Sequence, residues 1–419
     1  MLIRRQVARV RRTLDEYPRA FWILVLATFI DSLGGFMLFP FFSLYITQKF
    51  GVGMTQVGLL FAMFSITDVT GSFIGGALTD RFGRKALTLF GLIVSAIVML
   101  LLGLAATFEQ FALAALAVGI FASVGGPARQ AMVADILPES QRAEGFGLLR
   151  VVFNVSATIA PAIGGLLAAR SYLLIFIADA VISGITAVIV YVALPETKPM
   201  LRRGGGPSES IARTFLGYGQ VLRDALFMAF AGVCVLMGIV YIQMNTTLGV
   251  YLRDLHGITP QYYGYMLSMN AVIVVLFQFA VTRRVKVWPE FLAMAIGTTL
   301  YAVGFGMYGF VSVYPMFLLA MVIITVGEMI VAPVGQALVA RLSPEAMRGR
   351  YMAMFGFSWA IPAMIGPLLA GLTMDNLDPR WVWYSVGLIG LVAALGFIGL
   401  GRVIVRREQR LRAAAEPAA

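Results

Sequence analysis

Hydrophobic residues run through this chain in continuous stretches of about twenty or more, separated by short polar breaks. The hydrocarbon core of a bilayer is about 30 Å thick, and a helix of roughly 20 apolar residues crosses it. The pattern therefore predicts twelve membrane-spanning helices, over residues 20–47, 54–79, 86–107, 110–134, 144–169, 171–194, 225–252, 260–282, 288–309, 313–341, 347–373 and 380–401.

The spans divide into two sets of six, which predicts an all-α membrane protein of two helical bundles. The longest stretch outside the predicted spans contains Gly204-Gly205-Gly206-Pro207-Ser208 and is too short for an independent domain. We expect a first six-helix bundle over 1–194, a cytoplasmic linker over 195–224, a second six-helix bundle over 225–401 and a cytoplasmic tail over 402–419.

The composition excludes other fold classes. Of the 419 residues, 60% are hydrophobic and 13% are charged, whereas soluble domains are about 45–50% apolar and roughly 25% charged. Disordered chains are poor in apolar residues, and outer-membrane barrels alternate their residues in segments of about ten. A single cysteine, Cys234, allows no internal disulfide, and no metal-binding Cys/His spacing occurs. We therefore expect no metal and no cofactor.

The net charge of +11 is an orientation signal. If both termini are cytoplasmic, 28 of the 32 Lys and Arg residues fall in cytoplasmic segments, and the external loops hold only Lys49, Arg170, Arg253 and Arg380. Such an excess is typical of the cytoplasmic side of membrane proteins. We therefore expect a multi-pass protein of a cell membrane, with a bacterial inner membrane as the setting, and no nucleic-acid partner.

The chain repeats itself at an offset of 206 residues. Gln130-Ala131-Met132-Val133-Ala134 recurs as Gln336-Ala337-Leu338-Val339-Ala340, and the same offset pairs Gly58 with Gly264 and Ala160-Pro161 with Gly366-Pro367. A shift by six spans preserves orientation, so the halves are parallel repeats. In transporters of this kind the substrate site lies near the bilayer midplane between the halves, and one half rocks against the other.

The end of predicted span two carries the string Gly76-Ala77-Leu78-Thr79-Asp80-Arg81-Phe82-Gly83-Arg84-Lys85. Its small residues permit close helix contact, and its charges can form contacts that differ between two conformations. The string closely resembles the signature G-x-L-x-D-R-x-G-R-K of the major facilitator superfamily, in the loop between spans two and three. With the span count and the repeat, the resemblance covers nearly the whole chain.

This resemblance implies a conformational switch. It implies that Asp80 holds the outward-facing state by meeting the start of span eleven, and that Arg84 pairs with an acid at the end of span four, here Asp135. The equivalent positions of the second half are Thr282 and Lys286. The motif has decayed there, so we expect the switch to be one-sided.

Predicted span five resembles the antiporter signature G-x-x-x-G-P-x-x-G-G. Serine and alanine replace two of its glycines, so that it contains Ser156, Ala160, Pro161, Gly164 and Gly165. Small residues permit tight helix packing and proline introduces a kink. Support for antiport and simple close packing both remain open. The family's span-four motif with a buried arginine is not evident in Ala115-Leu116-Ala117-Val118-Gly119.

Acids at bilayer depth are the main functional candidates, because a charge there costs at least about 2.5–3.5 kcal/mol on insertion scales. Asp31 lies near the middle of span one and Glu328 near the middle of span ten, two spans that the resemblance places at the central cavity. Protonation removes the charge of a carboxylate, so a cation and a proton can compete for it. A buried structural hydrogen bond is the alternative for each. Asp68, on a face of small residues in span two, is a third candidate, and Asp179 is expected to make a structural contact.

Three polar residues are candidate partners for these acids: Arg129 near the end of span four, and Arg150 and Asn154 one turn apart on span five. The sequence does not choose among the pairs. His256 follows Arg253 and Asp254 in an external connection and is expected to be a solvated loop residue.

No phosphate-binding loop and no H-E-x-x-H or G-x-S-x-G string occurs, so we expect no enzyme and no direct use of ATP. The resemblance is strongest to twelve-span drug:proton antiporters. It implies a monomeric exporter of hydrophobic or cationic compounds, driven by protons through Asp31 and Glu328. The alternatives are a symporter, a transporter of sugars or lipid-linked substrates, and, outside transport, a membrane-embedded enzyme or scaffold.

Overall fold

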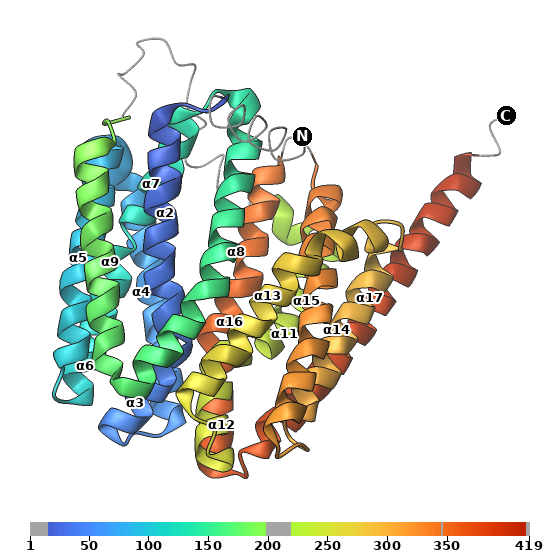
Figure 1. The fold of residues 1–419 in the computed structure, drawn as a ribbon. Coiled ribbons are helices and arrows are strands. Elements are labelled where there is room, and N and C mark those ends of the chain that lie inside the picture. The colour runs from blue at the N-terminus through green and yellow to red at the C-terminus, as the bar shows by residue number, and fades with distance from the viewer. Residues whose placement is uncertain (1–15, 198–218, 345–346, 416–419) are drawn as a thin grey trace, which may run out of the picture. The chain divides into compact units, whose positions relative to one another are not determined.

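The computed structural model describes residues 16–197, 219–344 and 347–415 (Figure 1). Within these ranges the side chains at 80, 139, 143, 348–349 and 407–415 are not described. Most of the predicted linker, residues 198–218, and the end of the predicted tail, residues 416–419, lie outside the described residues.

The first half of the described chain is helical throughout, with short breaks. It contains α2 (Arg19–Leu38), η1 (Phe39–Phe41), α3 (Phe42–Phe50), α4 (Met54–Phe82), α5 (Arg84–Leu104), α6 (Phe108–Ala117), η2 (Val118–Ala122), α7 (Gly125–Ile136), α8 (Glu139–Arg170) and α9 (Tyr172–Ala193). Predicted span one consists of α2, η1 and α3. Pro40 lies in the 3-10 turn between the two α-helices, where a residue without an N–H group interrupts the α-helical hydrogen bonds.

The second half has the same character. Its described helices are α11 (Ala225–Thr246), α12 (Leu248–His256), α13 (Pro260–Val285), α14 (Glu290–Met307), α15 (Tyr314–Leu342), α16 (Arg348–Asn376) and α17 (Arg380–Ala415). The predicted span 225–252 is divided in the structure, because α11 ends at Thr246 and α12 is a separate short helix. Thr247, between the two helices, has φ −117° and ψ −37°, and its hydroxyl donates to Oε1 of Gln243 at 2.6 Å.

Twelve helical segments of the described chain are long and apolar enough to cross a membrane. This finding confirms the predicted number of spans and the all-α class. The predicted break between spans five and six, after Arg170, is present as well. It lies at Ser171, whose hydroxyl accepts from the N–H of Leu173 and caps the start of α9.

The described residues form two compact units. One contains 16–50, 63–197 and 260–268, and the other contains 51–62, 219–259, 269–344 and 347–415. The division therefore does not follow a single boundary at the linker. The first turns of α4, up to residue 62, belong to the second unit, whereas the rest of α4 belongs to the first. The first turns of α13, over 260–268, belong to the first unit, whereas the rest of α13 belongs to the second.

Glycines explain the exchange of these first turns. A Cβ atom at Gly58 of α4 would lie 2.6 Å from the carbonyl oxygen of Pro367. At the repeat-related position, a Cβ atom at Gly264 of α13 would lie 2.5 Å from the carbonyl oxygen of Pro161 and 3.1 Å from Cα of Gly165. Only glycine allows backbones to approach this closely. The same contact is therefore built twice, once in each unit.

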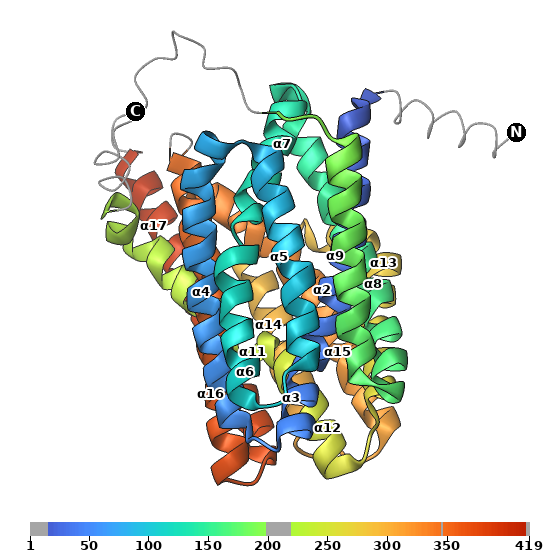
Figure 2. The same ribbon diagram turned by 90° about the vertical axis from the view of Figure 1, so that its left-hand side faces the viewer.

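The packing inside the two units also follows the repeat. In the first unit α5 lies beside α9 and α2 beside α8, as Figures 1 and 2 show; in the second, α14 lies beside α17 and α11 beside α16. A buried tyrosine marks the same place in each. The Tyr45 hydroxyl donates to the carbonyl of Leu102 at 3.2 Å. The Tyr251 hydroxyl donates to the carbonyl of Tyr308 at 2.8 Å, and both of these residues follow their first-half counterparts by 206 positions.

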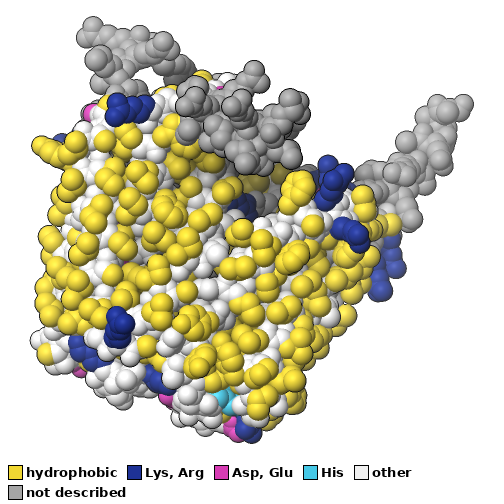
Figure 3. Space-filling model, in the orientation of Figure 1, with side chains coloured by type: hydrophobic (Ala, Val, Ile, Leu, Met, Phe, Trp, Pro, Cys, Tyr) yellow, Lys and Arg dark blue, Asp and Glu magenta, His cyan; other side chains and the backbone are white. Residues whose placement is uncertain are grey.

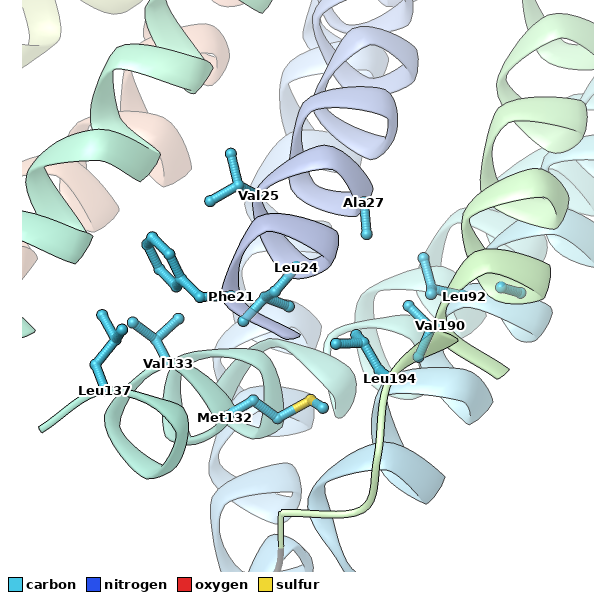
Figure 4. Packing of buried hydrophobic residues seen from close by; sticks show 11 residues of the cluster. Phe21, Leu24, Val25, Ala27, Leu92, Met132, Val133, Leu137, Val190 and Leu194 are labelled. Atoms are coloured by element: carbon cyan, nitrogen blue, oxygen red, sulfur yellow. The ribbon is translucent and has the colours of Figure 1, made fainter. Parts of the chain in front are cut away.

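Apolar side chains of α2 form one core of the first unit (Figure 4). Phe21 and Leu24 of α2 pack with Met132 and Val133 of α7, and Val190 of α9 lies in the same cluster. Because lipid chains are as apolar as these side chains, the cluster stabilises the unit through close packing more than through removal of surface from water. This packing holds α7 against α2, which positions the site described below.

The outer faces of the helices are hydrophobic. Large apolar side chains such as Phe73 and Phe279 are 77% and 80% exposed, and Figure 3 shows hydrophobic side chains covering the sides of the helices, with most of the visible basic side chains toward the helix ends. Contiguous apolar surface of this extent is incompatible with water and typical of a protein surrounded by lipid.

Candidate functional site

Asp31 is paired with Arg129. The Asp31 carboxylate on α2 accepts a charge-assisted hydrogen bond from Nη1 of Arg129 on α7. The two side chains are 22% and 33% exposed, so the pair is largely removed from solvent. Arg129, one of the three candidate partners predicted from the sequence, thus pairs with Asp31.

A cavity of about 780 Å³ lies beside this ion pair in the first unit. Asp31, Arg129 and Arg150 provide its charged groups, and the rest of the wall is mainly apolar, with Thr28, Ser32 and Gln130 adding polar groups. The full lining is Leu24, Thr28, Asp31, Ser32, Gly35, Phe36, Phe39, Gly126, Arg129, Gln130, Val133, Phe146, Leu149, Arg150 and Phe153. Such a wall suits an amphipathic small molecule. Asn154, also a candidate partner, is exposed and is not among the lining residues.

Glu328 is held by neutral groups. Its carboxylate on α15 accepts from the hydroxyl of Tyr241 on α11 at 3.0 Å and from the amide of Asn270 on α13 at 3.0 Å. The Asn270 amide also donates to the hydroxyl of Thr325 at 2.9 Å, one turn before Glu328 on α15. The ring of Tyr301 on α14 lies 5.6 Å from that of Tyr241. The second unit thus surrounds its midspan acid with uncharged donors from two other spans.

Asp68 has a structural environment. Its carboxylate accepts from the hydroxyl of Ser123, in the turn between η2 and α7. The face of α4 that carries it packs on the same segment, because a Cβ at Gly71 would lie 2.7 Å from the carbonyl of Gly119. This confirms that the face of small residues is packed. Asp179 is 5% exposed and its carboxyl group lies against Gly34 of α2, which agrees with the structural contact predicted for it.

The ion pair expected between Arg84 and Asp135 is present. Nε of Arg84, at the start of α5, lies 3.0 Å from Oδ2 of Asp135 near the end of α7. The side chains are 10% and 21% exposed, and Nη1 of Arg84 also donates to the carbonyl of Thr79 at 3.2 Å. Arg84 of the loop signature thus belongs to a largely buried ion pair.

The other residues of the signature differ in what they contact. Gly76 has nothing within 4 Å of its Cβ position, so no close helix contact occurs at that glycine in the structure. Arg81 lies with its guanidinium carbon 5.5 Å from the centre of the Phe82 ring. The side chain of Asp80 is outside the described part of the chain, and its role stays a prediction.

Sequence reasoning missed Glu196. This carboxylate follows α9 and accepts from the backbone N–H groups of Arg84 at 2.9 Å and Lys85 at 3.2 Å, at the first turn of α5. Gly83 makes the arrangement possible: its φ is +99°, and a Cβ there would lie 2.5 Å from Oε2 of Glu196. An acid directly after a span in a strongly basic segment was the available signal.

The second half keeps an ion pair at the positions equivalent to Arg84 and Asp135, with the charges exchanged. Nη1 of Arg341 lies 2.5 Å from Oε2 of Glu290, and both positions follow their counterparts by 206 residues. An ion pair therefore occurs at these positions in both halves, and the one-sided switch stays a prediction. The decay at Thr282 and Lys286 concealed the second ion pair, because a reversal of charge does not match a motif.

The antiporter-like segment of α8 packs closely on its neighbours. The Ser156 hydroxyl donates to the carbonyl of Phe29 on α2 at 3.2 Å, and Ala160 is 1% exposed. Gly164 lies against the carbonyl of Met37, and Gly165 against the first turn of α13, as described above for Gly264. Pro161 lies within the helix. The small residues of this segment therefore pack closely on α2 and α13, and their support for antiport stays a prediction.

His256 is not a solvated loop residue. It ends α12 and packs between the rings of Tyr251, at 5.1 Å, and Phe317, at 4.8 Å. Burial, with a smaller contribution from the charge of Arg380, lowers the pKa of His256 from its ordinary value of 6.5. The prediction failed because one buried ring neighbour comes from α15, which the local sequence does not reveal. Among the described residues, no group of three or more His, Cys, Asp or Glu side chains is arranged to hold a metal ion.

Comparison with known proteins agrees with this geometry. The family model of the Major Facilitator Superfamily matches residues 24–292 and 244–418. The chain is a member of this superfamily. It is therefore a multi-pass membrane transporter of the MFS type and not an enzyme, as the resemblance of the loop signature implied.

Relatives of this MFS transporter match it over most of both chains. It is 30% identical to the MFS-type transporter YttB of Bacillus subtilis strain 168, over 90% of this chain and 94% of the relative. It is 26% identical to the Na(+), Li(+), K(+)/H(+) antiporter of Planococcus maritimus, over 92% and 96%. It is 23% identical to the multidrug resistance protein MdtH of Aeromonas hydrophila subsp. hydrophila, over 89% and 93%.

Solved structures share the fold. A POT family transporter, crystallised with 5-aminolevulinic acid, superposes on this MFS transporter with a TM-score of 0.77 over 92% of this chain and 97% of the other. The two sequences are 16% identical, so this likeness supports the architecture alone.

Proposed function

We propose that this MFS transporter is a proton-coupled exporter of hydrophobic or cationic compounds that works by alternating access. The observation that carries the proposal is the environment of Glu328, whose carboxylate is held by the neutral donors Tyr241 and Asn270. A charged carboxylate near the bilayer midplane is costly, and either a proton or a substrate cation can neutralise it. Because the donors that the structure gives to Glu328 are uncharged, protonation leaves no unpaired cation among them, and exchange of a proton for a substrate cation is inexpensive at this acid.

Asp31 has a different role in this proposal. Protonation of Asp31 would leave Arg129 without its partner at membrane depth, which is costly for a largely buried ion pair. Arg150 adds a further positive charge to the same cavity. The Asp31–Arg129 pair therefore disfavours a cation at this wall of the first unit, and we assign it to conformational coupling and contact with substrate. The cation and proton site is assigned to Glu328.

Two of the relatives support proton-coupled export. One is named as a multidrug resistance protein and another as a cation/proton antiporter. The name of the cation/proton antiporter also favours another candidate function, the exchange of alkali cations for protons. The oxygens of Glu328 and the hydroxyls of Tyr241 and Thr325 are ligand types that hard cations accept. On the distribution of basic residues, we further infer that both termini are cytoplasmic. A monomer in a bacterial inner membrane stays a prediction.

Transport by reconstituted protein tests the proposal. Proteoliposomes with an imposed pH gradient and an internal pH dye are offered lipophilic cations, uncharged hydrophobic compounds, Na⁺ and K⁺. We expect at least one substrate to drive proton movement, and Glu328→Gln to abolish that coupling while substrate-for-substrate exchange continues. Asp254→Asn, which removes an exposed acid outside the spans, is the matched control and should couple normally. Undiminished coupling in Glu328→Gln would sink the assignment.

A further inference from the structure

Three charged positions recur in the two halves with every sign reversed. The first-half triad is Arg84, Asp135 and Glu196, and the second-half triad, 206 residues later at each position, is Glu290, Arg341 and Arg402. In each triad the first two members form the ion pair described above. The third member is an acid, Glu196, in the first half and a base, Arg402, in the second. The space beside the ion pair therefore suits different groups in the two halves.

In the first unit the chain itself fills this space with an anion. Glu196 accepts from the N–H groups of Arg84 and Lys85 at the start of α5. A carboxylate at this position satisfies N–H groups that have no helical partner and lies at the positive end of the helix dipole. The local requirement is therefore a negatively charged group with at least two acceptor oxygens.

In the second unit the equivalent space is a cavity with cationic walls. It has a volume of about 490 Å³ and lies where the start of α14 meets the ends of α15 and α17. Arg341, Arg402 and Arg406 line it together with Glu290, which leaves a net charge of +2 on its walls. The start of α14 has no side-chain cap. Among the described side chains, none caps this helix start as the Glu196 carboxylate does in the first unit.

The rest of the cavity wall is apolar and borders the lipid-facing surface. Phe291, Leu292, Ile398 and Val405 contribute to it, and Leu292 and Val405 are 48% and 52% exposed. Arg402 and Arg406 lie in the last described turns of the candidate span Arg380–Arg406. Figure 3 shows basic side chains toward the upper end of the α14 and α17 face, with hydrophobic side chains below them. The cavity therefore combines arginine side chains with apolar side chains that border the lipid-facing surface.

We propose that this cavity binds an anionic phospholipid. Its phosphate occupies the place that the Glu196 carboxylate fills in the first unit, held by Arg402 and Arg406, and its acyl chains lie along α14 and α17. Basic pockets between transmembrane helices at the cytoplasmic surface are suited to anionic headgroups, and arginine matches phosphate geometry through paired hydrogen bonds. The proposal is independent of which substrate is transported.

Lipid binding to the purified full chain tests the site. Native mass spectrometry and thermal unfolding are followed with added phosphatidylglycerol, phosphatidylcholine or inorganic phosphate. We expect phosphatidylglycerol to bind and raise Tm, and the other two to have little effect. The double variant Arg402→Gln/Arg406→Gln should lose roughly tenfold or more in affinity for phosphatidylglycerol. The matched control is Arg283→Gln/Arg284→Gln, which removes two exposed arginines at the end of α13 and should bind as the parent does.

A second variant separates loss of the site from loss of folding. Arg402→Glu places in the second unit the residue type that the first unit has at Glu196. We expect it to unfold at the parent's Tm or above without lipid, because the carboxylate satisfies the start of α14, and to show no further rise with phosphatidylglycerol. The proposal is overturned if the α13 control loses as much affinity as the double variant, if Arg402→Glu responds to phosphatidylglycerol as the parent does, or if inorganic phosphate raises Tm as much as the lipid.

Discussion

The carboxylate of Asp31 and the guanidinium of Arg129 form an ion pair although 98 residues separate them in the chain. Close packing of α7 on α2 brings them together, and each is largely shielded from solvent. A charge pair at this depth is tolerated because each partner compensates the other. The consequences of removing one partner or both can therefore be distinguished.

Removing one member of this pair should destabilise the protein more than removing both. In Asp31→Asn, Arg129 keeps its charge in a poorly solvated place, and we expect a loss of roughly 1–3 kcal/mol. In Asp31→Asn/Arg129→Gln no unpaired charge is left, and most of that loss should be recovered. Thermal unfolding of Asp31→Asn, Arg129→Gln, the double variant and the parent, as a double-mutant cycle, measures the coupling. Additive single effects would contradict the ion pair.

The two charge-reversed pairs should differ in their contribution to stability. Arg84 and Asp135 are 10% and 21% exposed, whereas Arg341 and Glu290 are 53% and 30% exposed. Asp135→Asn leaves a buried guanidinium and should cost about 3 kcal/mol or more. Glu290→Gln acts on a more solvated pair and should cost less than about 1 kcal/mol. Chemical or thermal unfolding of the two variants compares them, and equal losses would show that burial does not set the difference.

Gly264 should tolerate no added methyl group. A Cβ there would lie 2.5 Å from the carbonyl oxygen of Pro161, a backbone atom that cannot move without displacing α8. We expect Gly264→Ala to lower stability by roughly 1–3 kcal/mol through overpacking. Gly184→Ala on α9 is the matched control, since nothing lies within 4 Å of that Cβ position. The control should be neutral or slightly stabilising because alanine is the better helix former.

His256 should make stability depend on pH. Burial, and to a smaller extent Arg380, lowers the pKa of His256 below 6.5 in the folded protein. The unfolded chain then binds the proton more readily, so this contribution to stability is complete above about pH 6.5 and is lost as the pH falls below it. Thermal unfolding between pH 5 and 8 should show a decline of Tm on the acid side that is smaller in His256→Phe. The same decline in both proteins would assign it to other groups.

Several features of the fold could be predicted from patterns that extend over many residues. Apolar stretches long enough to cross a bilayer predicted twelve spans, and the structure contains twelve such helical segments. The repeat at 206 residues predicted related halves, and the hydrogen bonds of Tyr45 and Tyr251 to the ends of α5 and α14 follow it. The pair of Arg84 with Asp135 was expected from the loop signature, which combines many residues at defined spacing.

Other contacts could not be predicted because they depend on the rotation of each helix about its axis. Arg129, Arg150 and Asn154 were candidate partners of the midspan acids, and the sequence did not choose among the pairs. A span's composition indicates depth and does not indicate which neighbour a side chain faces. Glu196 matched no motif, and its contact with the start of α5 depends on the positive φ of Gly83.

The sequence by itself determined the number of spans, the all-α class, the internal repeat and the short list of midspan acids. These follow from the length that hydrocarbon requires of a helix and from the cost of a charge within it. Only the tertiary structure decided that Asp31 meets an arginine while Glu328 meets a tyrosine and an asparagine. The reason is physical: partners are chosen by helix packing between distant segments, where small residues let backbones approach and thereby set which faces meet.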